Sequence, residues 1–177
     1  MGFLRRLRGH DDTDDGQPRE VASIYAGLRD GLLSLDPSSV GIHPTPETPN
    51  VWGLVMDWSL DRAVATIVSL ADGTTSMYLS TGGGSIGAGE HPAPAAASIA
   101  AVRLAESRID DFHPVSDSPV PVRGRTVLTL LTFSGLRRFE DDNAAFENGS
   151  SRLAPVANAM QQVIHEIQQA EASTRAR

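Results

Sequence analysis

Residues 51–80 carry the pattern that most restricts the fold of this chain. They contain three runs of β-type residues: large apolar side chains recur at every second position of the first run, and Thr75, Met77 and Leu79 alternate with Ser76, Tyr78 and Ser80 in the last. A period of two is typical of strands, because successive side chains point to opposite faces of a sheet. Asp72 and Gly73 stand between the last two runs, and both tolerate the positive φ of a tight hairpin. The segment predicts a β-meander with a two-residue turn at Asp72-Gly73. One face of its first strand would carry Trp52, Leu54, Met56 and Trp58.

Three helices with one apolar stripe each are predicted around the meander. Pro18 suits a first helical turn, and residues 18–35 follow with apolar residues three and four positions apart. This stripe consists of Val21, Ile24, Tyr25, Leu28 and Leu32. Residues 94–109 and 153–171 have the same periodicity. A helix with a single stripe covers a sheet once, so we expect these helices to pack on one face of the sheet.

The order of the segments indicates the fold class. Residues 125–133 form an almost continuous apolar run, typical of a central strand, and residues 136–140 predict a short edge strand. The order α-β-β-β-α-β-β-α favours an α+β fold, with a mainly antiparallel sheet of four or five strands and helices packed on it. We expect a single domain at residues 18–172, a flexible charged tail at residues 1–17 and a C-terminal tail at residues 173–177.

The composition excludes several kinds of chemistry. The chain has no cysteine, which excludes disulfides and thiolate nucleophiles. All 15 basic residues are arginine, so neither a Schiff-base lysine nor a P-loop lysine is present. The five histidines lack the spacing of metal ligands, and we expect no metal and no cofactor. The net charge of −7 argues against general nucleic-acid binding.

The sequence favours a cytoplasmic, bacterial protein. No stretch approaches the roughly 20 apolar residues of a transmembrane helix. No apolar region follows the basic start, as it would in a secretory signal. Phe3, Leu4 and Leu7 have helical spacing within this start, which is either a solvated tail or a weak docking segment.

A glycine-rich segment precedes the second helix and supplies the candidate ligand-binding residues. They are Gly82, Gly83, Gly84, Ser85, Gly87, Gly89, Glu90 and His91. The segment matches the dinucleotide pattern G-x-G-x-x-G, but that fingerprint needs a parallel βαβ unit, which a meander does not provide. Backbone N–H groups ahead of a helix can also hold an anion such as a phosphate or nucleotide. Alternatively, the glycines allow the backbone to pack closely against protein, and we favour packing.

The same segment matches the nucleophile pattern G-x-S-x-G at Ser85. Possible partners lie downstream, at Asp110, Asp111, His113 and His165. The pattern belongs on the parallel sheet of an α/β-hydrolase, which this segment order does not predict. We therefore expect neither histidine within hydrogen-bond distance of Ser85, and we assign no catalytic residue.

Two stretches resemble a family of small uncharacterised bacterial proteins. They are SLADGTTSMYLSTGGGSIGAGEH at residues 69–91 and PVPVRGRTVLTLLTFSGLRRFE at residues 119–140. Family members combine an ADGT…YxSTGGGxIGxGEH segment with a later strand that ends in LTFxG. The resemblance covers about residues 50–170 and implies that residues 82–91 are a family hallmark. It implies no activity.

These observations favour a non-enzymatic protein-interaction domain that binds a protein partner or associates with itself. The alternative is a small-molecule or anion-binding domain, or an enzyme, that uses residues 82–91.

Overall fold

The computed structural model describes residues 18–175 of the 177-residue chain. The predicted tail at residues 1–17, with Phe3, Leu4 and Leu7, lies outside the described residues, as do residues 176–177. The helices are α1 (Pro18–Leu33), α2 (Pro92–Glu106), α3 (Asn143–Glu147) and α4 (Ala154–Arg175). The strands are β1 (Val51–Ser59), β2 (Val64–Leu70), β3 (Thr75–Leu79), β4 (Gly84–Ser85), β5 (His113–Val115), β6 (Arg125–Thr132) and β7 (Gly135–Asp142). Short 3₁₀ turns occupy Pro37–Val40, Ala88–Glu90 and Ile109–Asp111.

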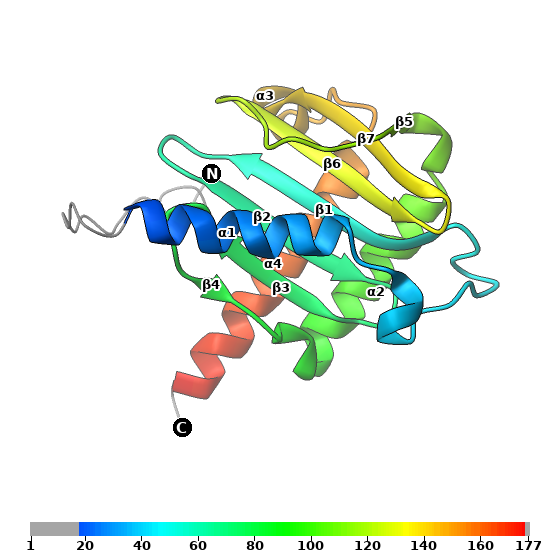
Figure 1. Cartoon of the computed structure of the whole chain (residues 1–177), viewed down its shortest axis with the longest axis horizontal. Coiled ribbons are helices and arrows are strands. Elements are labelled where there is room, and N and C mark those ends of the chain that lie inside the picture. The colour runs from blue at the N-terminus through cyan, green and yellow to red at the C-terminus, as the bar shows by residue number, and fades with distance from the viewer. Residues whose placement is uncertain (1–17, 176–177) are drawn as a thin grey trace.

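The strands form one antiparallel sheet in the order β4-β3-β2-β1-β6-β7-β5 (Figure 1). The predicted α+β class with an antiparallel sheet is therefore confirmed. The predicted number of four or five strands is wrong, because the sheet has seven strands. β4 and β5 have only two and three residues, which is too short for a periodic pattern. β7 forms at the predicted edge strand, but β5 pairs outside it.

The predicted hairpin joins β2 and β3, with a different turn. The Leu70 carbonyl accepts a hydrogen bond from Gly73 N at 3.0 Å, so Ala71 and Asp72 are the central residues of the turn. Gly73 follows at a φ of 90°. This is a three-residue loop with glycine in the left-handed position, and the prediction of a two-residue turn is wrong. The Asp72 carboxylate stabilises the loop by accepting a hydrogen bond from Thr74 N at 2.8 Å.

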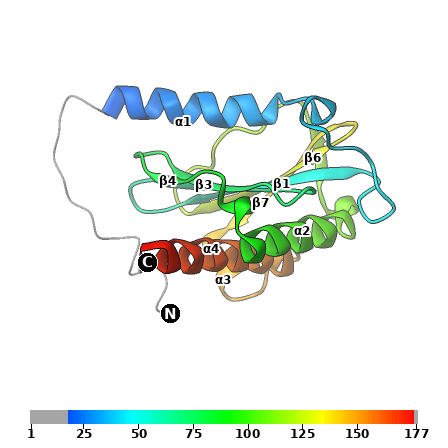
Figure 2. The same cartoon turned by 90° about the horizontal axis from the view of Figure 1, so that it is seen from below.

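Helices cover both faces of the sheet. Figure 2 shows α2 and α4 on one face and α1 across the other. The prediction of helices on one face is therefore wrong. Helices pack on both faces because the central strand β1 carries apolar side chains on both faces of the sheet. All nine residues of β1 are buried.

Two hydrophobic cores result. The larger lies between the sheet and the pair α2 and α4, and it contains the α4 stripe of Val156, Met160, Val163 and Ile167. The smaller lies beneath α1 and contains Tyr25, Trp52, Val55, Val68, Tyr78 and Leu131. A β-bulge between Val51 and Gly53 separates Trp52 from Leu54, Met56 and Trp58, which belong to the larger core. The prediction that these four side chains share one face is wrong for Trp52.

Candidate functional site: the outer surface of α1 and the β3–β4 hairpin

A buried ion pair fixes α1 on the sheet. The Arg29 guanidinium of α1 donates to both carboxylate oxygens of Asp57 on β1, at 2.6 to 3.2 Å. It also donates to the backbone oxygen of Ser118. The side chains of Arg29 and Asp57 have exposed fractions of 5% and 0%. Because a buried charge that loses its partner is costly, this pair holds α1 in one rotation about its axis.

Neutral hydroxyl groups surround the ion pair. Thr66 of β2 donates to Asp57 Oδ1 at 2.6 Å, and its Oγ1 lies 2.8 Å from the Tyr25 hydroxyl. Tyr25 packs edge-on against Tyr78 of β3, with ring centroids 5.8 Å apart. Burial raises the pKa of both tyrosines, and the charge of Asp57 adds to this rise. Burial alone lowers the pKa of Arg29, but the hydrogen bonds and charge of Asp57 raise it by more. The cluster therefore combines one ion pair, Arg29 with Asp57, with uncharged hydroxyl groups.

The ion pair turns part of the apolar stripe of α1 away from the sheet. Tyr25 and Arg29 face the sheet, while Ile24 and Leu28 are 57% and 41% exposed. The predicted stripe is therefore wrong at these two positions, although Tyr25 is buried as expected. Arg29, which the apolar pattern omits, takes the inward position instead.

The exposed residues Ile24 and Leu28 lie on the side of α1 that faces β3. Tyr25 leans toward β2 and β3, where it meets Thr66 and Tyr78. Successive helical residues turn by about 100°, so Leu28 and Ile24 follow Tyr25 in the direction away from Arg29. The same geometry places Asp30 on the opposite flank of α1.

Ile86 is the exposed apolar residue next to the edge strand β4. Gly84 of β4 pairs with Tyr78, which contacts Tyr25 of α1. Ile86 follows directly in the bend between β4 and the turn at Ala88–Glu90. Ile86 is 72% exposed, and Figure 2 shows β4 in the layer of the sheet, at the end of the molecule where the first half of α1 lies.

We call Ile24, Gly27, Leu28 and Ile86 the neutral patch. Residues 21–28 and 73–89, which supply it, contain no charged side chain. A β-carbon on Gly27 would meet no atom within 4 Å, so this position of the helix is open. The patch is apolar and uncharged in a chain of net charge −7.

The predicted ligand-binding segment forms β4, its flanking turns and the start of α2. Gly82, Gly83, Gly84 and Gly87 have φ values of 97°, 82°, 143° and 78°. A β-carbon on Gly84 would collide with the backbone of Met77 and Tyr78, and one on Gly89 with the backbone oxygen of Gly73. Glycine at these two positions allows close packing on the β2–β3 hairpin.

Several N–H groups of this segment already have acceptors within it. Gly82 donates to the Leu79 carbonyl at 3.0 Å, and Glu90 donates to the Gly87 carbonyl at 3.1 Å. An anion cradle needs free N–H groups that converge on one point, so these bonds favour packing. His91 begins α2 without a side-chain capping bond, and Ser85 pairs with Met77. Ligand binding by residues 82–91 stays a prediction.

Within residues 18–175, the residues considered for nucleophilic catalysis lie apart. Ser85 is on β4 and His113 on β5, at opposite edges of the sheet. His165 is exposed on α4. Asp111 pairs with Arg108 at 2.7 Å, and Asp110 is exposed. This arrangement does not form a nucleophile with a base and an orienting acid.

Residues 18–175 were compared with the requirements of a metal site and of a membrane-spanning helix, and they meet neither. They contain no group of three or more His, Asp or Glu side chains placed to hold a metal ion. Their helices include none that combines the length and the apolar character needed to cross a bilayer.

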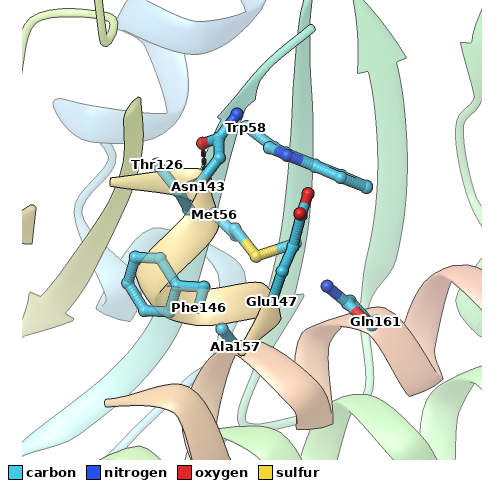
Figure 3. A pocket seen from close by; sticks show the side chains of 8 residues that line it. All are labelled: Met56, Trp58, Thr126, Asn143, Phe146, Glu147, Ala157 and Gln161. Atoms are coloured by element: carbon cyan, nitrogen blue, oxygen red, sulfur yellow. Dashed lines mark hydrogen bonds between the residues drawn. The ribbon is translucent and has the colours of Figure 1, made fainter. Parts of the chain in front are cut away.

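Two hollows were considered as ligand sites. The first, lined by Trp58, Asn143, Glu147 and Gln161 among others, has a volume of about 10 Å³ (Figure 3). That is about the space of one water molecule. The second, about 310 Å³, lies between His91 at the start of α2 and Thr174 at the end of α4. Most of its lining residues are exposed, so it is an open surface groove.

Comparisons with protein-family models, curated proteins and solved structures gave no match. The resemblance of residues 69–91 and 119–140 to a bacterial family therefore stays a prediction.

Sequence reasoning missed Arg29 and Asp57. Two signals were present: Asp57 interrupts an otherwise apolar strand, and Arg29 stands one helical turn after Tyr25 in the face that packs inward. An acid and a base that both fall at core positions of separate elements are a candidate buried pair.

Proposed function

We propose that this chain is a non-enzymatic protein-interaction domain of the cytoplasm that binds a protein partner through the neutral patch. The observation that carries the proposal is the setting of α1, which buries Arg29 while Ile24 and Leu28 remain exposed. A helix on a sheet normally buries its apolar residues and exposes its charges.

The energetics support a binding role for these residues. Burying a large aliphatic side chain contributes about 1.5–3 kcal/mol. In the isolated chain, much of this free energy is not realised by Ile24, Leu28 and Ile86, because their side chains are 41% to 72% exposed. A partner that covers these three side chains would add this burial free energy to the free energy of binding. Exposed apolar groups on one face are a usual mark of protein interfaces.

The alternative, a small-molecule or anion site at residues 82–91, has weaker support. The segment uses several of its N–H groups internally, and Gly84 and Gly89 lie against protein backbone. The hollow beside His91 is an open groove.

A capture experiment with matched variants tests the proposal. The variant Ile24→Asp/Ile86→Asp places two charges in the neutral patch. The control Val40→Asp/Val122→Asp changes two apolar residues of similar exposure, 47% and 70%, outside the patch. Tagged full-length chains are incubated with an extract of the native cells. We expect the wild type and the control to retain the same bound protein, and the patch variant to lose it. Retention by the patch variant would contradict the proposal.

A further inference from the structure

The connection between β5 and β6 contains a proline-rich segment. Its sequence is Ser-Pro-Val-Pro-Val-Arg at residues 118–123, and we call it the proline segment. Proline fixes its own φ near −65° and restricts the residue before it to extended or polyproline II backbone. Residues 117–122 accordingly form no helix, strand or turn. Figure 2 shows this yellow-green connection on the α1 side of the sheet.

Burial along this connection repeats every three residues. Val115 is partly buried, Ser118 and Pro121 are buried, and the two residues that follow each of them are exposed. A polyproline II helix has three residues per turn, whereas the side chains of a strand repeat every two residues. The period therefore indicates a polyproline II helix with one of its three rows of side chains turned toward the sheet. The other two rows face outward, with Pro119 and Val122 in one and Val120 and Arg123 in the other.

Three side chains hold the proline segment on the sheet. The buried Arg29 of α1 donates to the backbone oxygen of Ser118. The hydroxyl groups of Ser118 and of Thr129 on β6 lie 2.6 Å apart. Arg138 of β7 donates to the backbone oxygen of Pro119 at 2.8 Å. The segment is therefore ordered before a partner arrives, so that docking costs little conformational entropy.

The backbone of the proline segment is unsuited to the addition of a foreign strand. Strand addition needs a row of N–H and C=O groups. Pro119 and Pro121 have no N–H donor. The backbone oxygens of Ser118, Pro119 and Val122 already accept hydrogen bonds within the chain. A partner must therefore recognise the side chains of the outer rows, where Val120 and Val122 are 44% and 70% exposed.

We propose that the proline segment is a second docking site, which binds a protein that has an aromatic-lined groove with a carboxylate beside it. Preformed polyproline II segments are recognised in such grooves, where proline and aliphatic side chains of the outer rows pack against aromatic rings. Arg123 continues one outer row and pairs with Asp61 at 3.5 Å, where both side chains are exposed. Because an exposed ion pair is weak, a carboxylate of the partner can replace Asp61. This site goes beyond the proposed function, since it shares no residue with the neutral patch.

A capture experiment with tagged full-length chains tests the second site. The chains are incubated with an extract of the native cells, and bound proteins are eluted with decaproline, a peptide that adopts polyproline II. We expect the wild type to retain a protein that decaproline releases. The variant Val120→Asp/Val122→Asp should retain at least about tenfold less of it, because burial of even one valine contributes about tenfold in affinity. Both valines are exposed, so the urea midpoint of this variant should stay unchanged.

The variants of the neutral patch experiment serve as crossed controls. Ile24→Asp/Ile86→Asp should keep the protein that decaproline releases and lose only the partner of the neutral patch. Val40→Asp/Val122→Asp should keep the partner of the patch and lose the other protein, since it changes one residue of the proline segment. The proposed function and the second site can therefore fail separately.

A further variant tests the conformation of the segment. Pro119→Ala removes one prolyl ring from an outer row and releases the φ of this position. It should weaken binding of the purified captured protein about threefold, because more of the free segment must be ordered on docking. The control Pro46→Ala changes an exposed proline in the loop before β1 and should leave the affinity unchanged.

The aromatic groove has its own signal. The aromatic fluorescence of the captured protein should change when the wild-type chain is added, since Trp52 and Trp58 of this chain are buried. Three results would overturn the inference: no retained protein that decaproline releases, equal retention by the wild type and Val120→Asp/Val122→Asp, or a captured protein whose aromatic fluorescence does not change on binding.

Discussion

Replacing Arg29 by methionine should destabilise the fold far more than replacing both members of the ion pair. Methionine keeps most of the length of the arginine side chain but none of its charge. The carboxylate of Asp57, which is 0% exposed, would keep the hydrogen bond from Thr66 and lose all three from Arg29. Removing one partner of a buried pair costs about 3–5 kcal/mol in the free energy of unfolding.

Urea unfolding can be followed through the two tryptophans. Trp52 and Trp58 lie on β1, the strand that carries Asp57, and are 2% and 5% exposed, so their fluorescence reports the loss of both cores. With a urea slope of about 2 kcal/mol per molar, Arg29→Met should lower the midpoint by about 1.5–2.5 M. The double variant Arg29→Met/Asp57→Val should regain most of this loss, because an apolar pair avoids the desolvation of two charges. A loss below about 1 kcal/mol for Arg29→Met, or a double variant no more stable than the single one, would refute the reasoning.

Three further predictions concern other parts of the fold. Gly84→Ala should destabilise the chain by several kcal/mol, because its β-carbon would collide with the β3 backbone. Gly83→Ala should cost only about 1–2 kcal/mol, because its φ of 82° is strained but its β-carbon would lie in open space. Equal urea midpoints for the two variants would contradict this. Burial raises the pKa of Tyr78 above its ordinary value of 10.0, so above about pH 10 the unfolded chain loses this proton while the folded chain keeps it. Stability should therefore fall as pH rises above 10, and Tyr78→Phe should flatten the fall of the urea midpoint; an unchanged slope would exclude this cause. The Glu106 carboxylate accepts hydrogen bonds from the backbone N–H of Val51 at 2.6 Å and from Asn50, so Glu106→Ala should lower the free energy of unfolding by about 1–3 kcal/mol in the same assay.

The parts of the fold with a regular hydrophobic pattern were predictable from the sequence. The meander, the apolar strand β6 and the helices α2 and α4 form close to their expected residues. β4 and β5 were not predictable, because strands of two and three residues depend on their neighbours and not on their own pattern. The bulge that turns Trp52 to the other face also has no local signal.

The candidate site depends on a contact between residues far apart in the chain. The apolar stripe of α1 predicted a helix correctly, but its rotation is determined by the bond between Arg29 and Asp57, 28 positions away. The spacing of apolar residues does not reveal such a buried ion pair, because a charged residue considered alone indicates an exposed position. The glycine-rich segment shows the opposite case: its need for positive φ was visible in the sequence, and the structure has it at Gly82, Gly83, Gly84 and Gly87.

The two short outer strands determine how the sheet behaves toward other extended chains. An open edge offers a row of N–H and C=O groups to which a foreign strand can add, and long open edges promote fibrils. Here one edge is the two-residue β4, where Gly84 has a φ of 143°, and the other is the three-residue β5, which contains Pro114 and so lacks one N–H donor. Neither of these two outer strands is long and straight enough to be a template for continued strand addition. Over the residues that they cover, β4 and β5 therefore replace the longer strands β3 and β7 as the outer strands of the sheet.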